Sequence, residues 1–201
     1  MKNKIPDYLA IFRIIVGPLV MYLILIDGSE SGLMLIPAVL AFIGAWTDFF
    51  DGMLARKWNI TSKLGAFLDT IADKIFLTSI LLGLMFVGRV GIWITLLLIT
   101  REFVITGLRG LAGTEGISIP PSWGGKIKAS LQFWAIGFLL VDFPFAIVGY
   151  SIAEIILYSS LVVSYFTGYQ YIRAYFCLLY TSPSPRDQRG SGMAGWGWKK
   201  K

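Results

Sequence analysis

Histidine is absent from the sequence, and cysteine occurs once, at Cys177. These absences exclude a zinc site built from His and Cys, a catalytic triad that needs His, and an intrachain disulfide. Charged residues are also scarce, at 15% of 201 residues, whereas 56% are hydrophobic and the mean hydropathy is +0.69. The chemistry of this chain therefore rests on Asp, Glu, Lys, Arg, hydroxyl groups and the metal ions that carboxylates can hold.

The apolar residues form long runs, which indicates an all-α integral membrane protein. A membrane-spanning helix needs about 20 mostly apolar residues. We predict six transmembrane helices in one bundle, over residues 8–26, 32–54, 64–87, 91–111, 129–148 and 152–172. Gly17-Pro18 predicts a kink in the first. Arg13 interrupts that run and no small-residue cleavage site follows, so we do not expect a signal peptide.

Basic residues in the connections predict the orientation of these helices. They lie before the first helix, in the second and fourth connections, and after the last helix, whereas the first and fifth connections have none. Both termini and the second and fourth connections are therefore expected in the cytoplasm. Arg89, in the third connection, is the exception to this pattern.

The C-terminal stretch has a different character. Residues 177–187, CLLYTSPSPRD, resemble the translation of a sequencing adapter, and QRGSGMAGWGWKKK follows. We expect the native frame to end near Phe176, with 1–176 as one six-helix membrane domain and 177–201 as a non-native, disordered tail. A native disordered tail is the alternative. Five basic residues and one acid lie in this tail, so the net charge falls from +6 to +2 without it. The basic balance therefore gives no argument for binding nucleic acid.

Two pairs of aspartates stand out near the second connection. Asp48 and Asp51 lie one turn apart at the end of the second predicted helix, and Asp69 and Asp73 do the same at the start of the third. A hairpin of these helices would bring the pairs together. Four ionised carboxylates at a membrane edge need compensation, and all-oxygen ligands favour Mg²⁺ or Mn²⁺, plausibly two ions. The alternative is a solvated, polar loop end.

These residues match a family signature. The pattern Asp48-x2-Asp51-Gly52-x2-Ala55-Arg56-x8-Gly65-x3-Asp69-x3-Asp73 resembles that of the CDP-alcohol phosphotransferases, with no position missing. The resemblance implies a six-helix membrane fold and a cytoplasm-facing site for a CDP-linked donor and two divalent metals. It implies metal binding by Asp48, Asp51, Asp69 and Asp73, with Asp73 also the general base. It further implies CDP binding by Gly52, Ala55, Arg56 and Gly65.

A second stretch concerns the acceptor. TREFVITGLR (100–109) followed by GKIK (125–128) resembles the bacterial phosphatidylglycerophosphate synthases of this family, which implies sn-glycerol 3-phosphate as acceptor and CDP-diacylglycerol as donor. The pocket for the acceptor phosphate would contain Arg101, Arg109, Lys126 and Lys128, the two lysines at the mouth of the fifth helix. The alternative is local pairing of the deeper charges, with the lysines as cytoplasmic anchors. The family also implies a homodimer in the bacterial inner membrane.

The N-terminus departs from the family pattern Pro-Asn-x-Leu-Thr-x-x-Arg. This chain has Asp7 and Ala10 at the Asn and Thr positions and keeps Arg13. This chain therefore lacks the amide and the hydroxyl that the family pattern has at these two positions.

Other functions remain open on the sequence alone. The same chemistry on an inositol phosphate would also use basic residues, and phosphatidylglycerol, the acceptor in cardiolipin synthesis, would need a wider lipid entrance. A cation transporter would place acids at the bilayer midplane or show inverted repeats. A non-catalytic scaffold is the last alternative, and the intact signature argues against it.

Overall fold

The computed structural model describes residues 5–27, 34–58, 63–115, 123–142, 146–147 and 150–181, with the backbone alone at 5–6, 48–58, 63–64, 66, 146–147, 150 and 180–181. These residues form six helices and two short strands. In chain order they are α1 (Ile5–Asp27), α2 (Leu35–Trp58), α3 (Lys63–Phe86), α4 (Ile92–Thr114), α5 (Trp123–Val141), β1 (Ala146–Ile147), β2 (Tyr150–Ser151) and α6 (Ile152–Thr181). The prediction of an all-α chain with six helices is confirmed.

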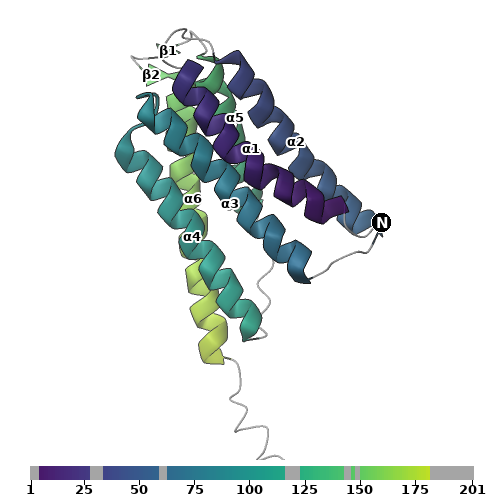
Figure 1. Cartoon of the computed structure of the whole chain (residues 1–201). Coiled ribbons are helices and arrows are strands. Elements are labelled where there is room, and N and C mark those ends of the chain that lie inside the picture. Colours follow the sequence, from purple (N-terminus) through teal and green to yellow (C-terminus); the bar gives the residue numbers. More distant parts are fainter. Residues whose placement is uncertain are drawn as a thin grey trace, which may run out of the picture.

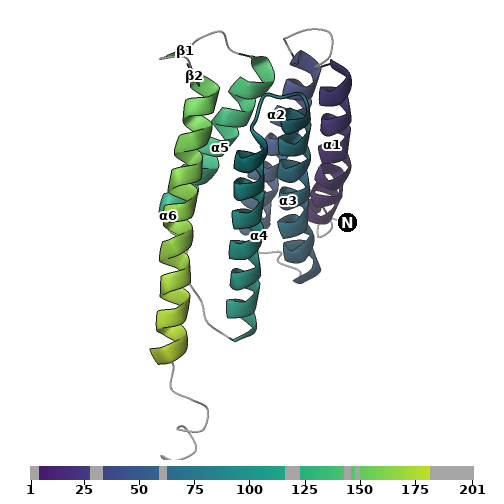
Figure 2. The same cartoon turned by 90° about the vertical axis from the view of Figure 1, so that its left-hand side faces the viewer.

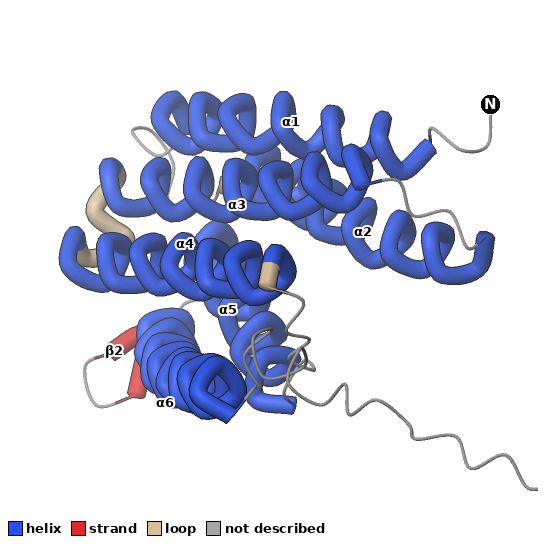
Figure 3. Tube along the Cα trace, turned by 90° about the horizontal axis from the view of Figure 1, so that it is seen from below, coloured by secondary structure: helices blue, strands red, loops and turns tan. Residues whose placement is uncertain are grey.

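The six helices run along one another in a single bundle (Figure 1). The most extensive helix contacts are those of α1 with α3 and of α5 with α6, followed by α1 with α2 and α4 with α6. In Figure 2, α1 and α6 lie on opposite sides of the bundle. Figure 3 shows α3 and α4 running side by side between them. Helix α3 is therefore a central element, with α1 on one side and α4 on the other.

One apolar core runs through the bundle. Its fully buried side chains include Val20 and Ile24 on α1, Ile80 and Leu84 on α3, and Leu98 on α4. Small residues let α1 and α2 approach α3: a Cβ at Gly17 would lie 2.9 Å from the Cα of Phe76, and one at Gly44 would lie 2.5 Å from its ring. The positions of α1 and α2 against α3 therefore depend on these two glycines.

Two of the helical stretches are both long enough and apolar enough to cross a bilayer, among the residues described. They are Asp7–Asp27, which runs through Pro18, and Ile152–Leu179; a shorter apolar stretch covers Leu35–Thr47. The six predicted membrane segments thus all contain helix, but only two meet this criterion. Charged side chains such as Asp73 and Lys74 on α3, or Arg101 and Glu102 on α4, lower the hydropathy of the others.

The connection between α3 and α4 also holds the end of α5. Gly88 has φ +78°, which only glycine adopts readily, and the turn brings Arg89 toward the last turn of α5. Arg89 Nη1 donates to the carbonyls of Leu139 (2.6 Å) and Leu140 (3.4 Å), and Nη2 lies 3.6 Å from Asp142 Oδ2. A cation at a helix C-terminus satisfies carbonyls that lack partners inside the helix. This contact gives Arg89, the exception in the orientation pattern, a structural role.

The predicted boundaries of the fifth helix are wrong. It was expected over residues 129–148, but α5 begins at Trp123 and ends at Val141. Asp142 follows with φ 52°, and β1 and β2 then pair antiparallel, Ala146 opposite Ser151. Lys126 and Lys128 therefore lie within the first two turns of α5.

The last helix begins at a capping box and extends further than expected. The backbone N–H of Ser151 donates to Glu154 Oε2 (2.9 Å), and the N–H of Glu154 donates to Ser151 Oγ (3.3 Å). Helix α6 continues to Thr181, so residues 177–181 are helical, contrary to the expected disorder from Cys177. The rest of the predicted non-native tail, residues 182–201, lies outside the described residues.

Candidate functional site

The two aspartate pairs lie at the same end of the bundle. Asp48 and Asp51 fall in the C-terminal half of α2, and Asp69 and Asp73 in the first half of α3. In Figure 1 these helix ends lie beside the start of α1. The predicted α2–α3 hairpin is present in the chain order, but its two helices contact each other only slightly, because α1 packs against both. The side chains of Asp48 and Asp51 lie outside the described ones.

Asp69 is held from α1. Its carboxylate Oδ1 accepts a hydrogen bond from Arg13 Nη2 at 2.5 Å, and the exposed fractions of the two side chains are 54% and 1% respectively. A fully buried guanidinium is costly unless it is paired, so Asp69 stabilises Arg13 while keeping half of its own surface accessible. Arg13 was not among the predicted site residues. The sequence feature that could have identified it is a charged residue inside an apolar run.

Asp73 is held from the other side of α3. Lys74 Nζ donates to Asp73 Oδ2 at 2.9 Å and to Glu102 Oε2 at 3.2 Å. Asp73 is 50% exposed, whereas Lys74 is 16% and Glu102 8% exposed. Asp69 and Asp73 thus lie one turn apart on α3, half accessible, each with a cation against one oxygen. Lys74 was not predicted as a site residue either.

Glu102 binds three cations in the interior of the bundle. Besides Lys74, it accepts hydrogen bonds on Oε1 from Lys128 Nζ of α5 and from Arg101 Nη1 at 3.1 Å. Arg101 continues to α6, where Nε donates to the carbonyl of Ser164 and Nη2 to Thr167 Oγ1, both at 2.9 Å. The buried network therefore joins α3, α4, α5 and α6.

The four cations predicted for the acceptor phosphate have different surroundings. Arg101 pairs with Glu102, as the alternative of local pairing predicted, and Lys128, a cytoplasmic anchor in that alternative, binds the same carboxylate. Arg109 is exposed and lies over the ring of Tyr171, 5.6 Å from its centre, and Lys126 lies over Trp123 at 5.1 Å. Residues two apart on a helix point about 200° apart, so Lys126 and Lys128 leave α5 in different directions. The sequence spacing could have shown this.

A metal site is only partly visible. Among the side chains described, no three acids or other ligating groups gather closely enough to hold a metal ion. Asp69 and Asp73 nonetheless offer accessible carboxylate oxygens on one face of α3, which suits a hard divalent cation. Gly52, Ala55 and Arg56 of the signature lie where the structure describes the backbone alone. Gly65 is half-buried on α3.

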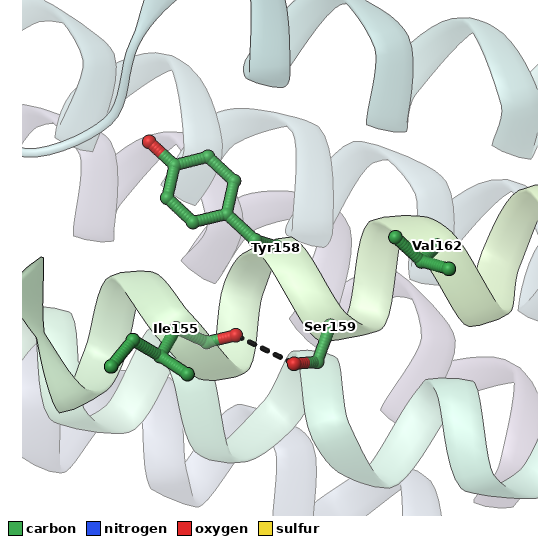
Figure 4. A pocket seen from close by; sticks show the side chains of 4 residues that line it. All are labelled: Ile155, Tyr158, Ser159 and Val162. Carbon is green, nitrogen blue, oxygen red and sulfur yellow. Dashed lines mark hydrogen bonds between the residues drawn. The ribbon is translucent and has the colours of Figure 1, made fainter.

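A hollow elsewhere on the surface has no such chemistry. It has a volume of about 400 Å³ and is lined by Ile155, Tyr158, Ser159 and Val162, all of α6 (Figure 4). Its one aliphatic hydroxyl, Ser159 Oγ, already donates to the carbonyl of Ile155 at 2.8 Å. The hollow contains no charged group and does not include the aspartates.

Comparisons with known proteins agree with the signature. Residues 3–166 match the family model for CDP-alcohol phosphatidyltransferase. A relative from Rickettsia typhi, named CDP-diacylglycerol–glycerol-3-phosphate 3-phosphatidyltransferase, is 35% identical over 176 residues, 87% of this chain and 97% of the relative. A relative of the same name from Bacillus subtilis is 30% identical, covering 89% of this chain and 98% of its own.

The fold has a solved counterpart. The crystal structure of Mycobacterium tuberculosis phosphatidylinositol phosphate synthase in apo form matches with a TM-score of 0.64, over 89% of this chain and 90% of that one. The sequences are 21% identical, so this similarity concerns the fold alone.

Proposed function

Because the chain belongs to the CDP-alcohol phosphatidyltransferase family, we propose that it transfers a phosphatidyl group from CDP-diacylglycerol to sn-glycerol 3-phosphate. The products are phosphatidylglycerol phosphate and CMP. The donor and acceptor are those named in the curated relatives from Rickettsia typhi and Bacillus subtilis, which this chain matches along most of its length. The structural observation that carries the proposal is the half-exposed pair Asp69 and Asp73, one turn apart at the end of α3.

In the proposed reaction, a hydroxyl oxygen of the acceptor attacks the phosphorus atom that carries the diacylglycerol. A new O–P bond forms, and the bond from that phosphorus to the CMP oxygen breaks. Asp73 accepts the hydroxyl proton, for which its 50% exposed carboxylate is suited. Since Lys74 occupies Oδ2, the carboxylate reaches the substrate from a defined orientation.

Two divalent ions, Mg²⁺ or Mn²⁺, belong to this proposal. Asp48, Asp51, Asp69 and Asp73 would hold them, and the ions would supply positive charge against the diphosphate. Asp69 fits this role because Arg13 keeps the carboxylate at the site end of α3 while half of its surface stays open. Gly52, Ala55, Arg56 and Gly65 are proposed to line the CDP group.

The acceptor phosphate needs cations as well. Arg109 and Lys126 are proposed to bind it, because both side chains are exposed. Each cation lies against an aromatic ring, and a ring does not compete with a phosphate for the cation. Arg101 and Lys128 are proposed to support the same pocket from inside, through Glu102.

We also propose that the bundle spans the bacterial cytoplasmic membrane six times, with both termini and the site in the cytoplasm. Large apolar side chains are exposed on every helix, among them Ile15 (64%), Ile36 (62%), Phe67 (61%), Trp93 (74%), Trp134 (57%) and Val162 (69%). Soluble monomers rarely expose so much apolar surface, whereas lipid covers it in a membrane. A homodimer in the bilayer is proposed from the family resemblance.

The test is CMP release by the full chain in detergent with CDP-diacylglycerol and Mg²⁺ or Mn²⁺. Glycerol 3-phosphate, inositol phosphate, serine and phosphatidylglycerol are offered separately. We expect release with glycerol 3-phosphate, and its loss in Asp73→Asn. The matched control is Asp142→Asn, at the other end of the bundle, where the φ of 52° also suits Asn. Release only with a different acceptor would overturn the assignment of glycerol 3-phosphate as the acceptor. No release by folded protein would overturn the enzymatic proposal.

A further inference from the structure

Lys74 lies between two carboxylates that belong to different helices. Its ammonium is 2.9 Å from Asp73 Oδ2 on its own helix, α3, and 3.2 Å from Glu102 Oε2 on α4. The Lys74 side chain is 16% exposed, so most of it is packed inside the bundle. One ammonium has three protons, and it can donate to both acids at once. The contact therefore links the half-exposed Asp73 to the buried interior.

Glu102 holds Lys74 in place from the inside. This carboxylate is 8% exposed and receives Lys128 and Arg101 on its other oxygen. Arg101 is in turn tied to the α6 carbonyl of Ser164. A carboxylate with partners on three helices has little freedom, and the ammonium that it binds shares that restriction.

The charges of this group are unbalanced within the interior. Lys74, Arg101 and Lys128 bring three positive charges to one buried acid, Glu102. A buried cation without an anion is costly, so an additional carboxylate lowers the energy of the group. Asp73 supplies that charge from the surface side. The attraction is mutual, and it restrains a carboxylate that at 50% exposure has room for other rotamers.

We propose that Lys74 is a positioning residue for Asp73: Glu102 fixes the Lys74 ammonium, and the ammonium fixes the Asp73 carboxylate. The inference rests on the proposed function, in which Asp73 takes the proton of the acceptor hydroxyl. Orientation of a reacting group is worth large factors in rate, and a displacement of about 1 Å can cost about 100-fold. Loss of Lys74 therefore lowers kcat without removing any group that binds the CDP-linked donor.

The experiment compares Lys74→Met, Lys74→Arg, Glu102→Gln and the Lys74→Met/Glu102→Gln double variant of the full chain. CMP release is measured against both substrates and kcat is normalised to the folded fraction from size exclusion. For Lys74→Met we expect kcat to fall by about 10–100-fold, with a much smaller change in KM for CDP-diacylglycerol, because Asp73 is only one of the four proposed metal ligands. Lys74→Arg should recover part of this loss, since it restores the charge. The double variant should have the kcat of Lys74→Met, because Glu102 acts on Asp73 through Lys74.

Two controls remove a charge outside the network. Glu115→Gln removes the charge of the carboxylate that accepts a hydrogen bond from the Tyr175 hydroxyl at the end of α4, and Arg173→Met changes an exposed residue of α6. Both should keep the wild-type kcat. If Lys74→Met fails to fold, Lys74→Gln takes its place, because it also removes the ammonium while remaining polar; a wild-type kcat in folded Lys74→Gln would then overturn the inference.

Several results would overturn the inference. A wild-type kcat in folded Lys74→Met, no recovery in Lys74→Arg, or kcat losses that multiply in the double variant would each do so. Failure of the proposed function looks different: the wild-type chain itself would then release no CMP, and both proposals would fall. If the wild-type chain uses another acceptor, the same comparison of variants is made with that acceptor.

Discussion

Gly17→Ala tests the packing that places the site. The added Cβ would lie 2.9 Å from Phe76 Cα, 3.4 Å from Phe76 N and 3.5 Å from Ile75 O, all backbone atoms of α3. Backbone cannot rotate away as a side chain can, so α1 and α3 must separate by about 0.5–1 Å to reach an ordinary carbon contact of 3.5–4.0 Å. Overpacking of this kind costs about 1–3 kcal/mol.

The matched control is Gly107→Ala on α4, where a Cβ would meet nothing within 4 Å. Both changes gain about 0.5–1 kcal/mol from the replacement of a helical glycine by alanine. The difference between the two variants therefore isolates the clash. At about 2–4 °C per kcal/mol for a chain of this size, the apparent Tm of Gly17→Ala should lie about 2–12 °C below that of Gly107→Ala.

The assay is thermal unfolding of both variants in the same detergent, read by circular dichroism. CMP release should also fall in Gly17→Ala, since Gly17 lies one turn from Arg13 and a shift of α1 lengthens the contact with Asp69. Equal Tm values for the two alanine variants would refute the close helix contact and the site geometry built on it.

Three further predictions follow from individual contacts. Asp69→Asn should lower the free energy of unfolding by about 1–3 kcal/mol, because it weakens the pairing of the buried Arg13 charge. Arg13→Met should lower it by less, because it leaves a carboxylate that water can reach. Chemical unfolding of both variants checks this order, and the reverse order would contradict it. Arg89→Met should cost about 1.5–3 kcal/mol through lost bonds to the α5 carbonyls, while Arg173→Met in the same unfolding assay should be neutral. A chelator should abolish CMP release and added Mg²⁺ or Mn²⁺ should restore it; release that persists after chelation would exclude the metal proposal.

The helices and the positions of the aspartates were predictable from local patterns. Long apolar runs marked all six helices, and the spacing of Asp69 and Asp73 placed them on one face of α3 at the site end. These features depend on residues within a turn or two of one another. Hydrophobic length and helical period are therefore sufficient to predict them.

The end of α5 was missed for a physical reason. The run after Val141, through FPFAIV, is as apolar as the helix itself, so hydropathy does not mark the boundary. The helix ends where Asp142 turns to φ 52° and where Arg89 binds the carbonyls of Leu139 and Leu140, which lie 50 and 51 residues later. A partner so distant in the sequence leaves no local pattern, although Pro144, two residues after Asp142, is a local helix-stop signal.

The pairing of Lys128 with Glu102 was missed for the same reason. Arg101 and Lys128 were expected at a substrate phosphate, but Glu102 binds both, 26 residues separating it from Lys128. The sequence did show that charges inside an apolar helix need partners. It did not show that one carboxylate would serve three cations, because that depends on how α3, α4 and α5 pack.

The two described carboxylates of the site are thus held by different parts of the bundle. Arg13 of α1 holds Asp69, and Lys74, backed by Glu102 of α4, holds Asp73. Both cations are mostly buried while both carboxylates stay half exposed, so the supporting charges are shielded from water and the acids are not. The separation of the two acids is set by one turn of α3, and their orientations are set independently from its two sides. A movement of α1 would therefore disturb Asp69 before Asp73, and a movement of α4 the reverse, which makes α3 the fixed element of the site.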